Sequence, residues 1–156
     1  MFRLLCAASI AAFSMANAHA GIVAEQIVEK EVVTKNADGT IAVKQTIPDT
    51  VTPGEELIYS LNFTNESADA AEAVVLVMPV PAVVSYIEGS VSGDDAAITF
   101  SADGGQTYVA RGRLTVAEGG AARPARSDEI THIKWTLADA LSPAGKGKIS
   151  YRAILK

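Results

Sequence analysis

Side chains that could do chemistry are few in this chain of 156 residues. It has one cysteine, Cys6, and two histidines, His19 and His132. Cys6 and His19 lie in the first twenty residues, which leaves His132 as the only histidine of the rest of the chain. A single histidine without a cysteine cannot build a zinc site with His and Cys ligands, and no Ser-His-Asp triad is evident around it. The alternation of residues along a strand turns His132 away from Trp135, toward the surface or an edge. We therefore predict no catalytic residue, no cofactor-binding residue and no enzyme activity.

Acidic residues form two small groups that offer oxygen ligands. Asp94 and Asp95 stand near Asp103, and Asp128 precedes Glu129. Carboxylate oxygens suit Ca²⁺, but these spacings match no calcium-binding loop. We predict no metal ligand, and a calcium-binding role stays only as an alternative.

The segment from Ser101 to Tyr108 follows the spacing Ser-x-Asp-x-Gly-x-Thr-aromatic, which is called an Asp-box. It is best known from sialidase propellers, where it lies away from the active site. A propeller takes at least about four blades, which one such box cannot build. Short polar side chains at this spacing hydrogen-bond the backbone of a turn, and glycine accepts a positive φ there. We predict a structural hairpin formed by Ser101, Asp103, Gly105 and Thr107.

The first twenty residues have the layout of a secretory signal peptide. A basic start that includes Arg3 precedes an apolar run, and Ala18-His19-Ala20 is a small-x-small cleavage signal. The apolar run is shorter than the roughly 20 residues needed to span a bilayer. Cleavage after Ala20 removes Cys6 and His19, and it takes the net charge from −5 to −6 because Arg3 is the only charged residue lost. We predict an exported protein of the periplasm, cell surface or extracellular space.

Alternating apolar and polar residues are the main structural signal in the rest of the chain. Gly, Pro, Asn and Asp punctuate the runs, and in one of them Leu57, Tyr59, Leu61 and Phe63 alternate with Ile58, Ser60, Asn62 and Thr64. The pattern predicts strands near 22–34, 40–47, 55–64, 71–78, 83–88, 96–101, 106–110, 113–117, 130–138 and 147–155. We predict a single all-β domain over 21–156, an immunoglobulin-like antiparallel β-sandwich of roughly seven to nine strands. Trp135 is the predicted core anchor, and 117–128 is predicted to be a surface loop.

Several motifs resemble one bacterial family. They are Val51-Thr52-Pro53-Gly54-Glu55, the run from Val74 to Pro81, Tyr86-Ile87-Glu88-Gly89-Ser90, Ile98 to Gly105, Thr131 to Leu137, and Ser142-Pro143-Ala144-Gly145. Together they resemble the repeat family catalogued as domain of unknown function 11. The resemblance covers nearly all of 21–156 and implies an immunoglobulin-like sandwich in an exported or surface protein. It implies no activity, and this chain shows a single copy where long surface proteins carry the domain in tandem.

The long strand predicted over 21–35 is rich in Val, Ile, Glu and Lys. Ile22, Ala24, Val28 and Val32 fall on one face of it. It either pairs within its own sandwich or acts as a donor strand inserted into the next subunit. Exchange of an N-terminal element also fits a swapped dimer.

Three functions follow, in order of preference. The first is a non-enzymatic structural or protein-interaction module, with protein partners that include copies of itself. The second is a subunit of an extracellular filament assembled by donor-strand exchange, and the third is a carbohydrate- or calcium-binding accessory domain. The acidic net charge argues against a nucleic-acid partner.

Overall fold

The structure is a computed structural model that describes residues 21–93 and 95–156. The predicted signal peptide and Asp94 lie outside the described residues. The described part is almost entirely β-structure, in ten strands: β1 (Ile22–Lys35), β2 (Ile41–Thr46), β3 (Glu56–Asn65), β4 (Val75–Pro79), β5 (Val84–Tyr86), β6 (Ala96–Ser101), β7 (Thr115–Glu118), β8 (Ala121–Pro124), β9 (His132–Leu137) and β10 (Lys146–Leu155). None of its helices is long and apolar enough to cross a membrane.

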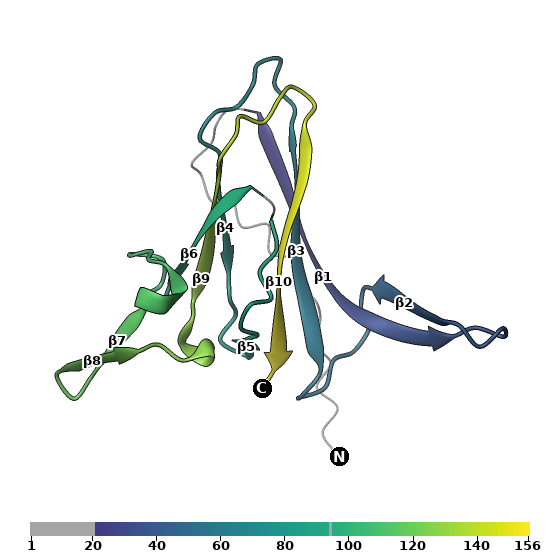
Figure 1. Ribbon diagram of the computed structural model, residues 1–156, viewed down its shortest axis with the longest axis horizontal. Coiled ribbons are helices and arrows are strands. Elements are labelled where there is room, and N and C mark those ends of the chain that lie inside the picture. The colour runs from purple at the N-terminus through teal and green to yellow at the C-terminus, as the bar shows by residue number, and fades with distance from the viewer. Residues whose placement is uncertain (1–20, 94) are drawn as a thin grey trace.

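The strands form two facing sheets and one separate hairpin (Figure 1). The larger sheet has the order β2-β1-β3-β10-β5, the smaller sheet has the order β4-β9-β6, and β7 pairs only with β8. All the ladders are antiparallel. The predicted all-β sandwich is therefore confirmed.

The immunoglobulin connectivity is not confirmed by the strand order. The structure has ten strands, where the prediction gave roughly seven to nine. Without the projecting β2 and the separate β7–β8 hairpin, seven strands face one another across the core. In immunoglobulin domains the second strand pairs with the fifth, and the seventh lies in the opposite sheet. Here β3, the second of the seven, pairs with β10, the last of them.

The core lies between the two sheets and contains the alternating residues of both. Tyr59 and Tyr151 are directly opposite in the β3–β10 register, and their rings stack at 5.0 Å. The Tyr151 hydroxyl donates a hydrogen bond of 2.7 Å to the carbonyl of Pro79, which joins the larger sheet to the smaller one. Trp135 on β9 is fully buried, and its indole N–H donates to the carbonyl of Ser92 at 3.0 Å. This polar partner lets a large side chain be buried without an unpaired donor.

Three segments differ from the sequence prediction. The predicted loop 117–128 instead contains the end of β7, all of β8 and most of a short 3₁₀ turn over Ser127–Glu129. The predicted strand 106–110 does not form, and only Val109 bridges to Phe100. The fourth strand begins at Val75 rather than near 71, because Ala73 has a positive φ of 50°, which breaks an extended run.

Candidate interaction surfaces

The outer half of β1 leaves the sandwich together with β2. Residues 22–29 pair with β3 on one side, whereas residues 30–35 pair with β2 on the other side. We call the projecting hairpin, residues 30–46, the β1–β2 arm; it points away from the two facing sheets in Figure 1. Pro48 lies two residues beyond the end of β2, where a residue without an N–H cannot donate to a continued ladder.

A tight loop closes the tip of the β1–β2 arm. The Asn36 N–H donates to the Thr40 carbonyl at 2.8 Å, and the Asp38 carboxylate accepts from the backbone N–H and the hydroxyl of Thr40. These hydrogen bonds lower the pKa of Asp38. Gly39 completes the loop with a φ of +87°, a conformation that favours glycine.

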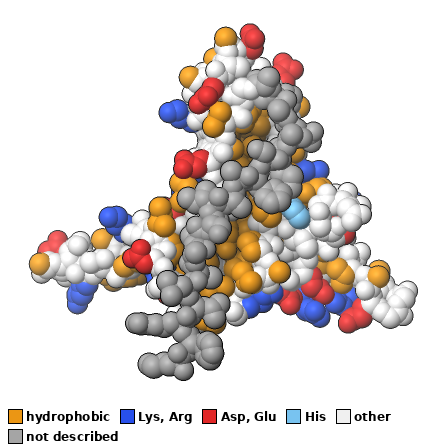
Figure 2. All heavy atoms as spheres, turned by 180° about the vertical axis from the view of Figure 1, so that it is seen from behind, with side chains coloured by type: hydrophobic (Ala, Val, Ile, Leu, Met, Phe, Trp, Pro, Cys, Tyr) orange, Lys and Arg blue, Asp and Glu red, His pale blue; other side chains and the backbone are white. Residues whose placement is uncertain are grey.

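The β1–β2 arm exposes apolar side chains that a sandwich normally covers. Val33, Ile41 and Val43 are 65%, 70% and 58% exposed, and Ile47 just beyond β2 is 73% exposed. Val33 and Val43 are directly opposite in the register, and Ile41 lies on the same face because it is two residues from Val43. Seen from behind in Figure 2, the arm projects to the left with hydrophobic and charged side chains intermixed. Large apolar groups gathered on one exposed face are typical of an interaction surface.

Ion pairs hold the root of the β1–β2 arm to the body. Arg152 on β10 contacts Glu31 and Glu56 at 2.6 Å each, and Lys30 contacts Glu55 at 3.2 Å. The hydrogen bond from Arg152 is the main reason that the pKa of Glu31 is lowered. These contacts reach Glu31, so the apolar residues from Val33 outward lie beyond the fastened part of the arm.

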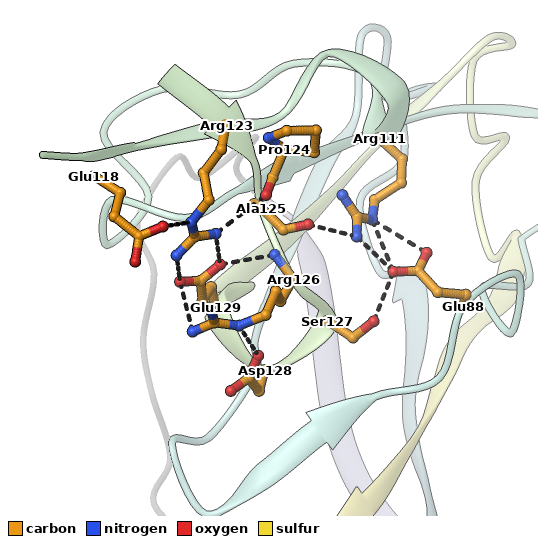
Figure 3. Close-up of polar contacts among 10 residues, drawn as sticks. All are labelled: Glu88, Arg111, Glu118, Arg123, Pro124, Ala125, Arg126, Ser127, Asp128 and Glu129. Carbon is orange, nitrogen blue, oxygen red and sulfur yellow. Dashed lines mark hydrogen bonds and ion pairs between the residues drawn. The ribbon is translucent and has the colours of Figure 1, made fainter. Parts of the chain in front are cut away.

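The second projecting hairpin, Thr115–Pro124, is the β7–β8 arm, and ion pairs run along its side. Arg123 contacts Glu118, and it forms a two-pronged contact with Glu129 at 2.6 and 2.7 Å (Figure 3). The guanidinium group lowers the pKa of Glu129 to about 2. Leu114 and Ala125 at the base of this arm are buried in the core, and the Ala125 N–H donates to the Leu114 carbonyl at 2.9 Å.

A further charged contact fastens the chain around this base. Arg111 donates to the Glu88 carboxylate at 2.5 and 3.1 Å and to the Ala125 carbonyl at 2.9 Å. Ser127 donates to the same Glu88 carboxylate at 2.7 Å. Glu88 and Arg111 thus have partners within the chain.

The Ser101–Thr107 turn contains the hydrogen bonds that the Asp-box spacing predicts. Ser101 donates to Asp103 at 2.6 Å and accepts from the Gly105 N–H at 2.9 Å. Asp103 also accepts from the Thr107 hydroxyl and N–H, and together these hydrogen bonds lower its pKa strongly. The Asp103 carboxylate accepts hydrogen bonds from residues of its own turn, so its role here is to stabilise the turn.

The remaining residues predicted from the sequence lie on β1 and β9. Ile22 and Val28 pack against the core from β1, Ala24 between them is exposed, and Val32 lies in the β1–β2 arm. His132 is half-buried, burial lowers its pKa, and its ring lies 3.1 Å from the Thr131 hydroxyl. Over 21–93 and 95–156, no three His, Cys, Asp or Glu side chains are grouped so as to hold a metal ion.

Comparison of the chain with family models, with curated proteins and with solved structures found no match to any of them.

Proposed function

We propose that this chain is an exported, non-enzymatic interaction module that contacts a protein partner through the β1–β2 arm. One observation carries the proposal: Val33, Ile41 and Val43 form an exposed apolar face on a hairpin that no other described segment covers. A two-stranded hairpin is only marginally stable in water, and three or more strands or a packing partner are normally needed. An arm of this kind therefore gains from a protein that adds strands to it or that covers its apolar face.

The export signal and the resemblance to domain of unknown function 11 are consistent with this proposal. Backbone pairing and apolar contact need no cofactor, so they suit a module of the periplasm or cell surface. The signal peptide and membership of that family stay predictions.

A photo-crosslinking amino acid at Ile41 tests the proposal in the cell that produces the protein. We expect ultraviolet light to join the chain covalently to a protein at this position. The matched control is Val83, which precedes β5 outside the arm and is 61% exposed. Crosslinking that fails at Ile41, Val43 and Ile47, or that is equal at Val83, contradicts the proposal.

A filament subunit that exchanges its N-terminal strand is a second candidate. Along residues 22–29, β1 has β3 as its only strand neighbour in the described chain, so its exchange breaks one ladder and the core contacts of Ile22 and Val28. An equivalent strand from another copy would restore the same register with β3.

A covalent link between β1 and β3 tests this second candidate. Val23 and Thr64 are directly opposite in the register, and opposite residues lie within the Cα separation that a disulfide accepts. In the double variant Val23→Cys/Thr64→Cys, oxidation keeps β1 in its own chain, and strand exchange requires that filaments then fail to form and return on reduction. Filaments that assemble equally well with the link intact rule out donor-strand exchange through β1.

A further inference from the structure

β2 pairs with β1 along one edge, and no described strand pairs with its other edge. An unpaired, partly apolar edge strand is a template for adding another strand. Proteins commonly protect such edges with proline or charged side chains, and over the six residues of β2 only Lys44 does so.

The hairpin loop determines which backbone groups point outward along that edge. The Asn36 N–H donates to the Thr40 carbonyl, which sets the phase of the β1–β2 ladder. Because hydrogen-bonded and non-hydrogen-bonded pairs alternate in an antiparallel ladder, residues 42, 44 and 46 direct their backbone groups to β1. Ile41, Val43 and Gln45 therefore direct theirs to the free edge, and these three residues are symmetric about Val43.

We propose that β2 pairs antiparallel with β2 of a second copy of this chain, across a two-fold axis at Val43. The inference rests on the proposed function, because it names the partner of the β1–β2 arm. Val43 then lies opposite Val43 of the second copy, and Ile41 lies opposite Gln45. The outward-facing groups of all three residues are used in about six new backbone hydrogen bonds.

The side chains complement one another in this register. On one face a row of four valines crosses the four strands, Val33 and Val43 from each copy. The flanking row places Lys35, Ile41, Gln45 and Glu31 in succession, so its two charged ends have opposite signs. On the other face Lys44 lies opposite Ala42, and no pair of like charges is directly opposite. Like charges in opposite positions would have destabilised the pairing.

The symmetry and the size of the contact define the assembly. A two-fold contact uses the same surface on both copies, so it closes at a dimer and does not grow. The contact consists of two six-residue strands and a few side chains. We expect it to be at or below the roughly 1,200 Å² at the lower end of stable interfaces, so that the dimer dissociates on dilution.

Sedimentation velocity of the purified full chain, in the processed form that the cell yields, tests the dimer from about 1 µM to about 1 mM, the range of weak affinities. We expect a reversible monomer–dimer equilibrium. Val43→Lys should raise its dissociation constant at least about tenfold, because two lysines then meet on the two-fold axis. Val83→Lys, at a similarly exposed valine, should leave it unchanged. A wild-type monomer throughout this range, or a dimer that Val43→Lys does not weaken, overturns the proposal.

A cysteine at the axis gives a second test that does not require disruption. In a Cys6→Ser background, Val43→Cys should form a disulfide-linked dimer on mild oxidation, because a cysteine at the axis meets its own copy. Val83→Cys is the control for random collision. Linking at Val43 that is no faster than at Val83 overturns the proposal, and it does so even if Val43→Lys unfolds the protein.

The crosslinking experiment at Ile41 separates this inference from the proposed function. An adduct with twice the mass of the chain supports the second copy. An adduct with a different protein, together with a monomer in sedimentation, leaves the proposed function standing and refutes the inference.

Discussion

The two projecting arms of this molecule are stabilised in different ways. The β7–β8 arm has a base buried in the core at Leu114 and Ala125, and its charges are paired within the chain through Arg123 and Glu129. Among the residues that the structure describes, the β1–β2 arm is fastened only at its root, and it exposes Val33, Ile41 and Val43 beyond it. An arm whose groups are satisfied internally needs no partner, whereas an uncovered apolar arm points to one. The two arms should therefore respond differently to substitution and to acid.

The largest effect is expected at the buried base of the β7–β8 arm. Leu114 is almost fully buried, so Leu114→Ala should lower the free energy of unfolding by about 2–5 kcal/mol. Ile41→Ala in the other arm should change it by less than about 0.5 kcal/mol, because that side chain already lies in water. Urea unfolding followed by circular dichroism, at a concentration where the chain is monomeric, measures both. Equal losses for the two variants would show that the β1–β2 arm is covered after all.

An intermediate effect is expected at the tip of the β1–β2 arm. Gly39→Ala meets no atom within 4 Å but places a side chain at a φ of +87°. We expect a local loss of about 1 kcal/mol, so that amides of residues 30–46 exchange about fivefold faster while the urea midpoint stays unchanged.

The matched control for that prediction is Gly112→Ala at the base of the other arm. Gly112 also has open space around it, but its φ is not positive. Hydrogen exchange measured by mass spectrometry should show no faster exchange in this variant. If both alanines accelerate exchange equally, the positive φ at Gly39 is not what closes the arm.

The smallest effect is expected from acid on the β7–β8 arm. The pKa of Glu129 is lowered from its usual 4.5 to about 2 by Arg123. A lowered pKa means that the ion pair contributes fully above pH 4.5, and that its contribution is lost as the pH falls from about 4.5 to about 2. Exchange of the amides of 115–124, corrected for the intrinsic rate at each pH, should therefore quicken over this interval.

The variant Glu129→Gln isolates this contribution. It should already show the faster exchange at pH 5 and respond less to further acid. Wild-type protein and variant with identical pH profiles would show that the Arg123–Glu129 contact does not fasten the arm.

Strong local patterns allowed much of the sandwich to be predicted from the sequence. β3, β6 and β10 match the predicted runs closely because apolar residues recur at every second position along most of each strand. β8 was missed because Ala121-Ala122-Arg123-Pro124 has no alternation and ends in proline. Its strand geometry depends on pairing with β7 and on the contact of Arg123 with Glu129, neither of which a local pattern reveals.

The candidate surface was harder to predict than the fold. Alternation around Ile41 and Val43 is that of a strand with one buried face, but the arm leaves the sandwich before the smaller sheet can cover it. Which strands of one sheet face the other depends on the size of both sheets, and that is a long-range property. The predicted strand 106–110 failed for a local reason instead, since Asp103 holds the N–H of Thr107 in a turn.

The position of Trp135 has a spectroscopic consequence. It is the only tryptophan of the chain, fully buried between the two sheets. Its fluorescence should be blue-shifted in the native state and should move to the red only when the sheets separate. Trp135 lies on β9 and in neither arm, so its fluorescence should not change when an arm opens or binds. The fluorescence therefore reports on the core alone.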